Sequence, residues 1–149
     1  MSVASSTEST MRGYLDALLD RGDFAAFFSD DVLWTTMETG DEVRGREAVR
    51  DYIMAMHTQV FDASPEVKSL TVGEGMAVIE AVFVGTHIGE FAGLAPTGAA
   101  VRLPYVVVYE VASERITALR AYVSFAGLKA QIQASGASTE ARTGADATS

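Results

Sequence analysis

The chain has 149 residues, two histidines, no cysteine and a formal net charge of -9. A chain of this length forms one core, the lack of cysteine excludes disulfides, thiol catalysis and Cys-based zinc sites, and two histidines are too few for a histidine-rich metal site. Because a negative protein repels a phosphate backbone, and because no apolar run is long enough for a membrane span or a secretory signal, we expect a cytoplasmic protein with neither nucleic acid nor membrane as partner.

The first half of the chain is expected to form helices around one strand. Apolar residues at three- and four-residue spacing predict an amphipathic helix from about Ser9 to Leu19 and another from Arg46 to about Val60. Between them we predict a short helical piece over Asp23–Phe28 and a strand over Val32–Met37. The charged segment Gly40–Gly45 is interpreted as a turn.

The second half is rich in β-branched and aromatic residues and is expected to form a sheet. The predicted strands run from Val67 to Val72, from Met76 to about Ile88, from Val101 to Val111 and from Ile116 to about Phe125. Helices followed by a sheet indicate an α+β protein. Pro104 has no N–H to donate, so we expect either a bulge or a sheet edge at that position.

The chain is expected to hold one domain over residues 8–133. From Ala134 to Ser149 it consists almost wholly of Ala, Ser, Thr, Gly and scattered charge. Such a segment has too few large apolar groups to pack, and we predict a disordered tail.

Two short segments resemble a known family. Residues 85–98 read G-T-H-I-G-E-F-A-G-L-A-P-T-G, and residues 127–132 read G-L-K-A-Q-I. The first resembles the G-T-H-x-G-x-F-x-G-x-x-P-T-G hairpin of SnoaL-like polyketide cyclases, which belong to the nuclear transport factor 2-like superfamily. The second is similar to their closing G-L-x-x-Q-L helix. The resemblance implies a cone-shaped fold, in which a curved antiparallel sheet wraps round three N-terminal helices and ligands enter the hollow.

Position 121 departs from the family that the chain resembles. Those cyclases carry an aspartate there as general acid and base, whereas this chain has Ala121, which cannot transfer a proton. The related epoxide hydrolases would place further polar catalytic residues where this chain has Ala81, Phe83, Trp34 and Thr36. The catalytic groups of neither branch are therefore carried over to this chain.

We expect an apolar and aromatic binding pocket on the concave face of the sheet. Side chains alternate along a strand, so the family alignment assigns every second residue of the central strands to that face. Trp34 has two readings, as a stacking surface for a flat ligand or as a plain core residue. The predicted substrate-binding residues are Leu15, Leu18, Trp34, Thr36, Tyr52, Met56, Ala81, Phe83, Leu103, Val107, Ala121 and Leu128.

Two polar residues are the catalytic candidates. The hydroxyl of Tyr105 is suited to donate a hydrogen bond to a substrate carbonyl, and His87 has the parity to point inward and the chemistry to act as acid or base near neutral pH. Each also has a structural reading, as a core tyrosine bonded to backbone and as a histidine bonded within the hairpin. His57, beside the apolar stripe of its helix, is interpreted as solvent-exposed.

These features together predict a cyclase of polyketide-type natural-product and antibiotic biosynthesis that uses no cofactor. Orientation of the substrate would close the ring, and a pericyclic, cycloaddition-like closure suits a pocket without carboxylates. Two alternatives stay open: an acid–base isomerase or cyclase that uses His87 and Tyr105, and a non-catalytic protein that binds a small apolar ligand. The resemblance also implies a homodimer through the convex face of the sheet, to which Glu80, Arg120 and Tyr122 are assigned.

Overall fold

A computed structural model describes residues 2–135 of the chain. The elements, in chain order, are α1 (Val3–Leu19), the 3-10 helix η1 (Phe24–Phe27), β1 (Phe28–Thr36), β2 (Asp41–Arg44), α2 (Arg46–Thr58), β3 (Phe61–Val72), β4 (Met76–His87), β5 (Ala100–Ala112) and β6 (Arg115–Tyr122). A last helix, called the C-terminal helix below, covers residues 125–135. Ala134 and Ser135, the expected start of the tail, continue this helix, and the rest of that prediction lies outside the described residues.

The strands form one six-stranded sheet in the order β2-β1-β6-β5-β4-β3. Neighbouring strands are antiparallel except for β1 and β6, which run parallel. The sheet is therefore mixed, where we expected it to be antiparallel throughout, because β1 comes from the helical half of the chain and lies beside the last strand. Its two edges, β2 and β3, do not meet, so the sheet is curved but not closed.

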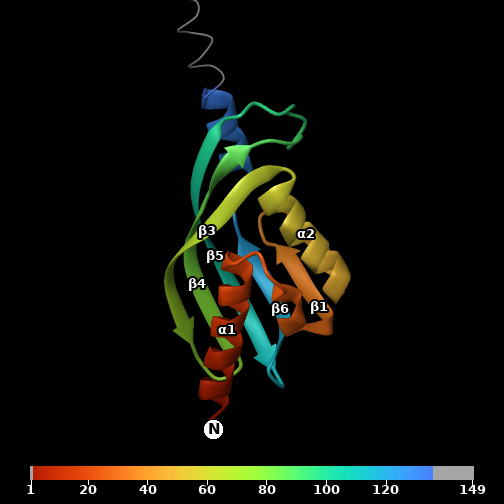
Figure 1. Cartoon of the computed structure of the whole chain (residues 1–149), viewed down its shortest axis with the longest axis vertical. Coiled ribbons are helices and arrows are strands. Elements are labelled where there is room, and N and C mark those ends of the chain that lie inside the picture. Colours follow the sequence, from red (N-terminus) through yellow and green to blue (C-terminus); the bar gives the residue numbers. More distant parts are fainter. Residues whose placement is uncertain (1, 136–149) are drawn as a thin grey trace, which may run out of the picture.

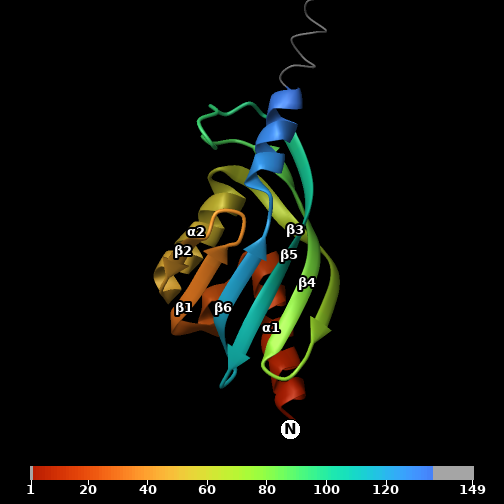
Figure 2. The same ribbon diagram turned by 180° about the vertical axis from the view of Figure 1, so that it is seen from behind.

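The helices cover the concave face of this sheet, as expected. Helix α1 lies across the face in front of β4 and β5, and α2 lies along β1 (Figure 1). The view from behind shows the convex face (Figure 2). Met11 and Tyr14 of α1 and Val49 and Ile53 of α2 are buried in one cluster with inward residues of the sheet. This two-layer arrangement is the α+β fold that the sequence predicts.

Helix α1 begins six residues before the predicted start at Ser9. Ser2 is its N-cap, and its hydroxyl accepts a hydrogen bond from the Ser5 N–H at 3.1 Å. Thr7 and Thr10, which read as capping residues, lie inside the helix and are buried. Their hydroxyls donate to the carbonyls four residues earlier, at 2.8 and 3.0 Å, and this bonding lets a polar residue occupy a buried helical position.

The segment expected to be a charged turn contains strand β2. Asp41 to Arg44 pair with the end of β1, and Val43 is their half-buried apolar side chain. A short, charged strand at a sheet edge resists pairing with other chains, so its sequence resembles that of a turn. Strand β3, at the other edge, begins at Phe61 rather than Val67 and includes Pro65, which an edge strand tolerates.

The C-terminal helix is held against β5 at the point where β6 ends. Pairing between β5 and β6 starts at Val106, so no residue of β6 pairs with Pro104, and the sheet-edge alternative holds there. Past the end of β6, the side-chain amide of Gln131 takes the place of a neighbouring strand. Its Oε1 accepts from the Arg102 N–H and its Nε2 donates to the Arg102 carbonyl, both at 2.9 Å. Ser124 caps the helix by accepting from the Gly127 N–H at 2.9 Å.

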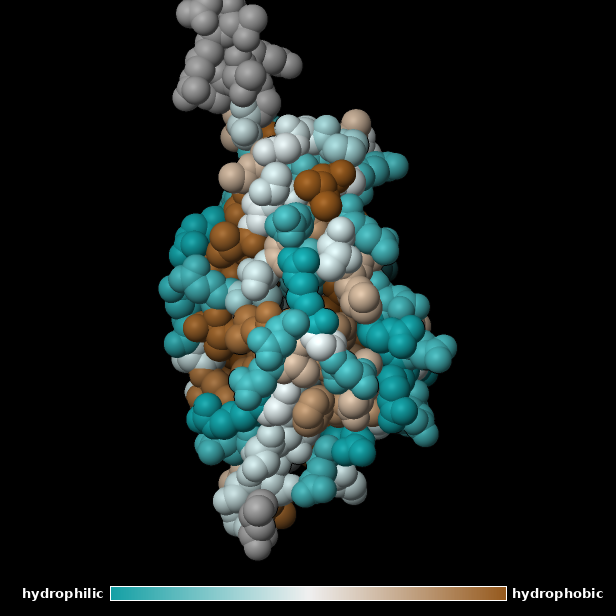
Figure 3. Space-filling view, viewed as in Figure 1, coloured by the Kyte–Doolittle hydropathy of each residue, from teal (hydrophilic) through white to brown (hydrophobic). Residues whose placement is uncertain are grey.

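The outer surface is mainly hydrophilic over α2, and hydrophobic patches lie on the side of β3 and β4 (Figure 3). On the convex face of the sheet, Glu80 is exposed, Tyr122 is 50% exposed and Arg120 forms an ion pair with Glu110. These three side chains have the outward direction that alternation predicts.

Candidate functional site

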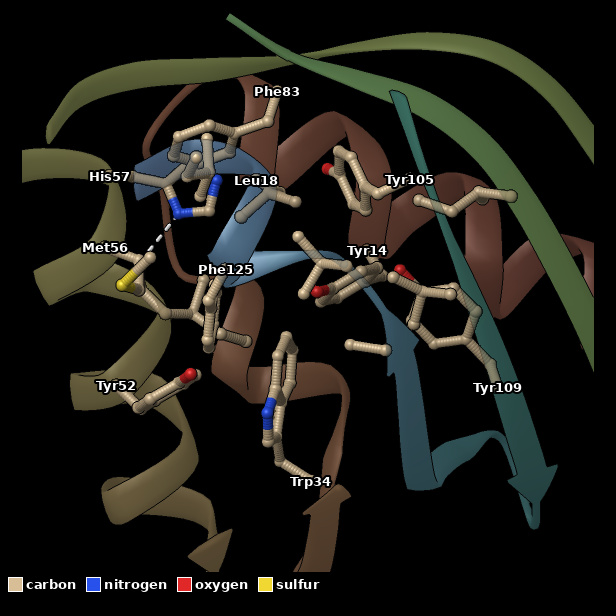
Figure 4. A pocket seen from close by; sticks show the side chains of 16 residues that line it. Tyr14, Leu18, Trp34, Tyr52, Met56, His57, Phe83, Tyr105, Tyr109 and Phe125 are labelled. Carbon is tan, nitrogen blue, oxygen red and sulfur yellow. Dashed lines mark hydrogen bonds between the residues drawn. The ribbon is translucent and has the colours of Figure 1, made fainter. Parts of the chain in front are cut away.

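A cavity lies between the concave face of the sheet, helices α1 and α2 and the C-terminal helix. Its empty space is about 620 Å³, the open mouth included. Residues of every layer contribute, and helix α2 faces strand β5 across it (Figure 4). It is lined by Tyr14, Leu18, Trp34, Tyr52, Ile53, Met56, His57, Ile79, Phe83, Tyr105, Val107, Tyr109, Ala121, Val123, Phe125 and Leu128. None of these described residues is acidic, so the wall is hydrocarbon and aromatic with a few hydroxyl and ring nitrogen groups.

The inner end of the cavity is closed by aromatic rings. Tyr14 and Tyr109 are each 2% exposed, and their ring centroids lie 5.7 Å apart in an edge-on arrangement. The two phenols lie close enough to affect each other's pKa, which burial raises in both. Phe28 also packs against Tyr14, with ring centroids 5.6 Å apart. This end of the cavity therefore presents mainly ring carbon to a ligand.

Nearer the mouth, Trp34 and Tyr52 form a second aromatic pair with centroids 5.2 Å apart. The indole N–H of Trp34 donates to the Thr36 hydroxyl at 3.0 Å. Thr36 is buried and does not line the cavity. Its hydroxyl holds the Trp34 ring, which does.

The hydroxyl of Tyr105, in the wall of the cavity, forms no hydrogen bond to another described residue. Its side chain points from β5 into the cavity near Phe83 (Figure 4). Burial raises its pKa above that of an ordinary tyrosine, so the phenol stays protonated at neutral pH. Tyr105 therefore has a protonated hydroxyl with no protein partner in the described part of the chain; its role toward a ligand stays a prediction.

His57 lines the same cavity from α2, which contradicts its assignment to the solvated side of the helix. Its Nδ1 lies 2.7 Å from the Ile53 carbonyl oxygen, and its Nε2 is buried without a hydrogen-bond partner in the described part of the chain. The ring packs edge-on against Phe83 with centroids 5.5 Å apart. One signal in the sequence would have found it: Val49, Ile53 and His57 follow at four-residue steps, which places them on one face of a helix.

Most of the predicted binding residues meet at this cavity. Leu18, Trp34, Tyr52, Met56, Phe83, Tyr105, Val107, Ala121 and Leu128 all line it. Leu15 and Ala81 are buried in the core around it. Leu103 packs against a second apolar cluster, which includes Phe61 and Leu128. Val123, which alternation places on the same face as Ala121, lines the cavity as well. Besides His57, sequence reasoning left out Tyr14, Ile53, Ile79, Tyr109 and Phe125 as lining residues.

His87 is fully buried, as its parity predicts, but it does not line the cavity. Its Nδ1 lies 2.9 Å from the Thr97 hydroxyl oxygen, which also accepts from the Ala99 N–H at 3.2 Å. The ring packs against Phe61 at 5.6 Å. His87 therefore ties the two arms of the 85–98 hairpin together, and the structure does not bring it to the wall on which Tyr105 lies.

Ala121 is 1% exposed and lies on β6 opposite Val107 of β5. Both residues line the cavity. Position 121 is thus part of the cavity wall, where it presents a methyl group. Within residues 2–135 there is no group of three or more His, Asp or Glu side chains that could hold a metal ion, and none of the helices is long and apolar enough to span a membrane.

Comparison with protein families gives one match: residues 9–132 fit the description SnoaL-like polyketide cyclase. This match covers most of the chain. No protein of curated function matches.

Solved structures of bacterial proteins share the fold. One from Jannaschia sp. CCS1, assigned as a SnoaL-like polyketide cyclase, has a TM-score of 0.78 at 17% identity over 89% of this chain and 94% of its own. A structure from Xanthomonas campestris, assigned as a polyketide cyclase, has a TM-score of 0.75 at 19% identity over 88% of this chain and 99% of its own. An epoxide hydrolase of Mycobacterium tuberculosis has a TM-score of 0.66 at 14% identity over 87% and 91%. Identities this low establish a common fold and leave the chemistry to the residues of the site.

Proposed function

The chain belongs to the family of SnoaL-like polyketide cyclases, and we propose on that premise that it is an enzyme that closes a ring in an apolar, polyketide-type substrate bound in the cavity. The observation that carries the proposal is the composition of the wall: hydrocarbon and aromatic faces surround one tyrosine hydroxyl, that of Tyr105, which has no partner among the described residues. Such a surface suits a largely apolar chain that bears a carbonyl oxygen.

Orientation supplies the first part of the proposed catalysis. A flexible chain held with its two ends in contact has already lost the entropy that ring closure costs, which is worth roughly 7 to 11 kcal/mol in the best intramolecular cases. The aromatic pairs Trp34–Tyr52 and Tyr14–Tyr109 would flank the substrate on two sides. A cycloaddition-like closure requires no proton transfer and is compatible with a methyl group at position 121.

Tyr105 supplies the second part. Its O–H would donate to a substrate carbonyl and draw electrons toward that oxygen as the ring forms. Because the surrounding wall is apolar, the hydrogen bond competes with little water. The same bond would also fix which end of the substrate faces the inner end of the cavity.

The setting that we propose is natural-product biosynthesis, in a homodimer formed through the convex face of the sheet. Val78, Val106 and Val108 lie at neighbouring positions of β4 and β5 on that face, where Tyr122 is half exposed. An apolar centre bordered by charged residues is the usual composition of such an interface.

Turnover of synthetic thioesters tests the proposal. Linear polyene and poly-β-ketone thioesters are incubated with the protein, and cyclised products are followed by liquid chromatography and mass spectrometry. Ala121→Leu should block the cavity and abolish product formation. Ala118→Leu, a matched change on the outward side of the same strand beside Glu110, should leave it unchanged.

Tyr105→Phe should slow closure about tenfold, which corresponds to the loss of one hydrogen bond of about 1.4 kcal/mol. Substrates that bind tightly and are recovered unchanged after long incubation would overturn ring closure and assign the cavity to ligand binding alone.

A further inference from the structure

The protonation pattern of His57 follows from its hydrogen bond. Its Nδ1 lies 2.7 Å from the carbonyl oxygen of Ile53, one turn earlier in α2. A carbonyl only accepts, so Nδ1 carries the proton and donates it. In the neutral ring the lone pair is then on Nε2, the nitrogen that is available as a base.

The surroundings of Nε2 contain no protein group that satisfies this lone pair. The atom is buried and has no hydrogen-bond partner among residues 2–135. In the close-up the ring extends from α2 toward the side of the cavity where Leu18 and Phe83 lie, and Tyr105 points to the same side from β5 (Figure 4). A buried acceptor without a partner is rare in proteins, and a site at which a ligand donates to it is one established reason for its presence.

Burial and a nearby positive charge both favour the neutral, basic form of His57. Burial holds the pKa of His57 below the usual value and outweighs the opposing effect of the bond to Ile53, and the Arg21 guanidinium lowers the pKa further. Arg21 is paired with Asp62 of β3 at 3.0 Å. The titratable groups that line the cavity with His57 are tyrosines, with raised pKa values at Tyr14, Tyr52, Tyr105 and Tyr109, and none of them is ionised at neutral pH.

His57 also lies at the wall of a second hollow. Together with Leu18 and Ile53 it lines both hollows, and the exposed residues Arg21 and Thr58 border the second one. The imidazole thus stands between the two hollows.

We propose that His57 is the general base of this cavity, that Tyr105 is its hydrogen-bonding partner for a carbonyl oxygen, and that the substrate class is an apolar ketone with an acidic α-hydrogen. Nε2 accepts the proton of the C–H bond next to the carbonyl, and the electron pair of that bond forms an enolate, whose oxygen is stabilised by the Tyr105 O–H. The enolate carbon then attacks a second carbonyl of the same chain, and the imidazolium returns its proton to the new alkoxide. This inference rests on the proposed function, because it assumes that the cavity binds the substrate.

Hydrogen exchange in a simple ketone tests the base separately from ring closure. The probe is 2-tetralone in D₂O, with exchange of its α-hydrogens followed by proton NMR, and 2-naphthol, a planar enol analogue, reports binding. The wild-type protein should accelerate exchange over buffer that contains the same concentration of free imidazole. His57→Gln should lower the rate at least 100-fold and still bind 2-naphthol, since a general base contributes about 10² to 10⁴ in rate.

The other histidine offers a matched control. His87→Gln changes a buried ring outside the cavity and should retain the exchange rate and its dependence on pH. In the wild-type protein the rate should fall as His57 becomes protonated at low pH, and this fall should be absent from the residual rate of His57→Gln. Added imidazole should restore exchange in His57→Ala, in which the ring is replaced by a space.

The outcomes separate the two proposals. Full exchange activity in His57→Gln would overturn the role of His57 and leave the cavity function standing. Binding of 2-naphthol without acceleration by the wild type would overturn proton transfer and leave closure by orientation. Binding of neither probe would overturn the apolar site itself, and the inference with it. If His57→Gln does not fold, ¹⁵N NMR of the wild type decides: a proton on Nε2 instead of Nδ1, or no response of Nε2 to 2-naphthol, refutes the assignment.

Discussion

Introducing a carboxylate at position 121 is the most direct probe of the cavity wall. In Ala121→Asp the new side chain would stand at a site that is 1% exposed, among the apolar residues that line the cavity. The described lining residues include no lysine or arginine to pair with it. An uncompensated buried charge destabilises a protein by about 3 to 5 kcal/mol. We therefore expect a loss of this size above neutral pH.

The pH dependence of this loss has a definite sign. Burial raises the pKa of the new carboxyl in the folded state, so at low pH, where it is neutral in both states, little stability is lost. As the pH rises from the pKa of this carboxyl in the unfolded chain to its higher pKa in the folded chain, the free energy of unfolding should fall by about 1.4 kcal/mol per pH unit. Ala121→Asn has nearly the same shape and no charge, and its loss of stability should not change with pH.

Urea unfolding followed by circular dichroism between pH 4 and pH 8 measures both effects. Ala112→Asp, at an exposed position of β5 opposite Arg115, controls for an added aspartate and should change stability by less than about 0.5 kcal/mol. If Ala121→Asp and Ala121→Asn unfold at the same urea concentration over the whole pH range, the carboxylate is hydrated or paired, and the description of an apolar cavity is wrong.

Acidification below pH 6.5, the ordinary pKa of histidine, should destabilise the protein through His57. Its pKa is lower in the folded chain, so the unfolded chain binds the proton first. In His57→Phe, the urea midpoint should therefore depend less on pH in this range. Gln131→Leu removes two hydrogen bonds to the backbone of Arg102 and should cost about 1 to 3 kcal/mol, with faster amide exchange in the C-terminal helix than in α1. Gly85→Ala would place a Cβ 2.5 Å from a side chain of β3 and should lower stability by about 1 to 3 kcal/mol in thermal melts. Gly73→Ala is the control: the nearest atom to its Cβ would be 3.9 Å away, so it should have little effect. Equal melting temperatures of the two variants would contradict the close approach at Gly85.

Elements with a clear apolar period could be predicted from the sequence. The two amphipathic helices and the central strands follow from spacing alone, since side chains repeat every 3.6 residues on a helix and every second residue on a strand. The elements that were missed lack this pattern: β2 is charged, the first turn of α1 is made of serine and threonine, and the start of β3 contains Pro65. Each is stabilised by partners distant in the chain, such as the pairing of β2 with β1.

The site shows the same division. Alternation along β4 correctly turns both Phe83 and His87 toward the interior, because the direction of a side chain depends on parity. Parity carries no information on distance along the strand, and four residues correspond to about 13 Å. At one level Phe83 meets α2 and the cavity, and at the other His87 meets Phe61 and the hairpin loop.

The sequence by itself therefore determined the family, the order of the main elements and the apolar character of the concave face, which includes Ala121. Tertiary structure alone decided which part of that face is hollow and which polar atoms in it are left without a partner, because both depend on how separate elements pack. The Ile53 carbonyl accepts the Nδ1–H of His57, and the Thr36 hydroxyl accepts the indole N–H of Trp34. Among the polar groups of the residues that line the cavity, the hydroxyl of Tyr105 and the buried Nε2 of His57 have no partner in the described part of the chain; they are a donor and an acceptor on opposite layers of the fold.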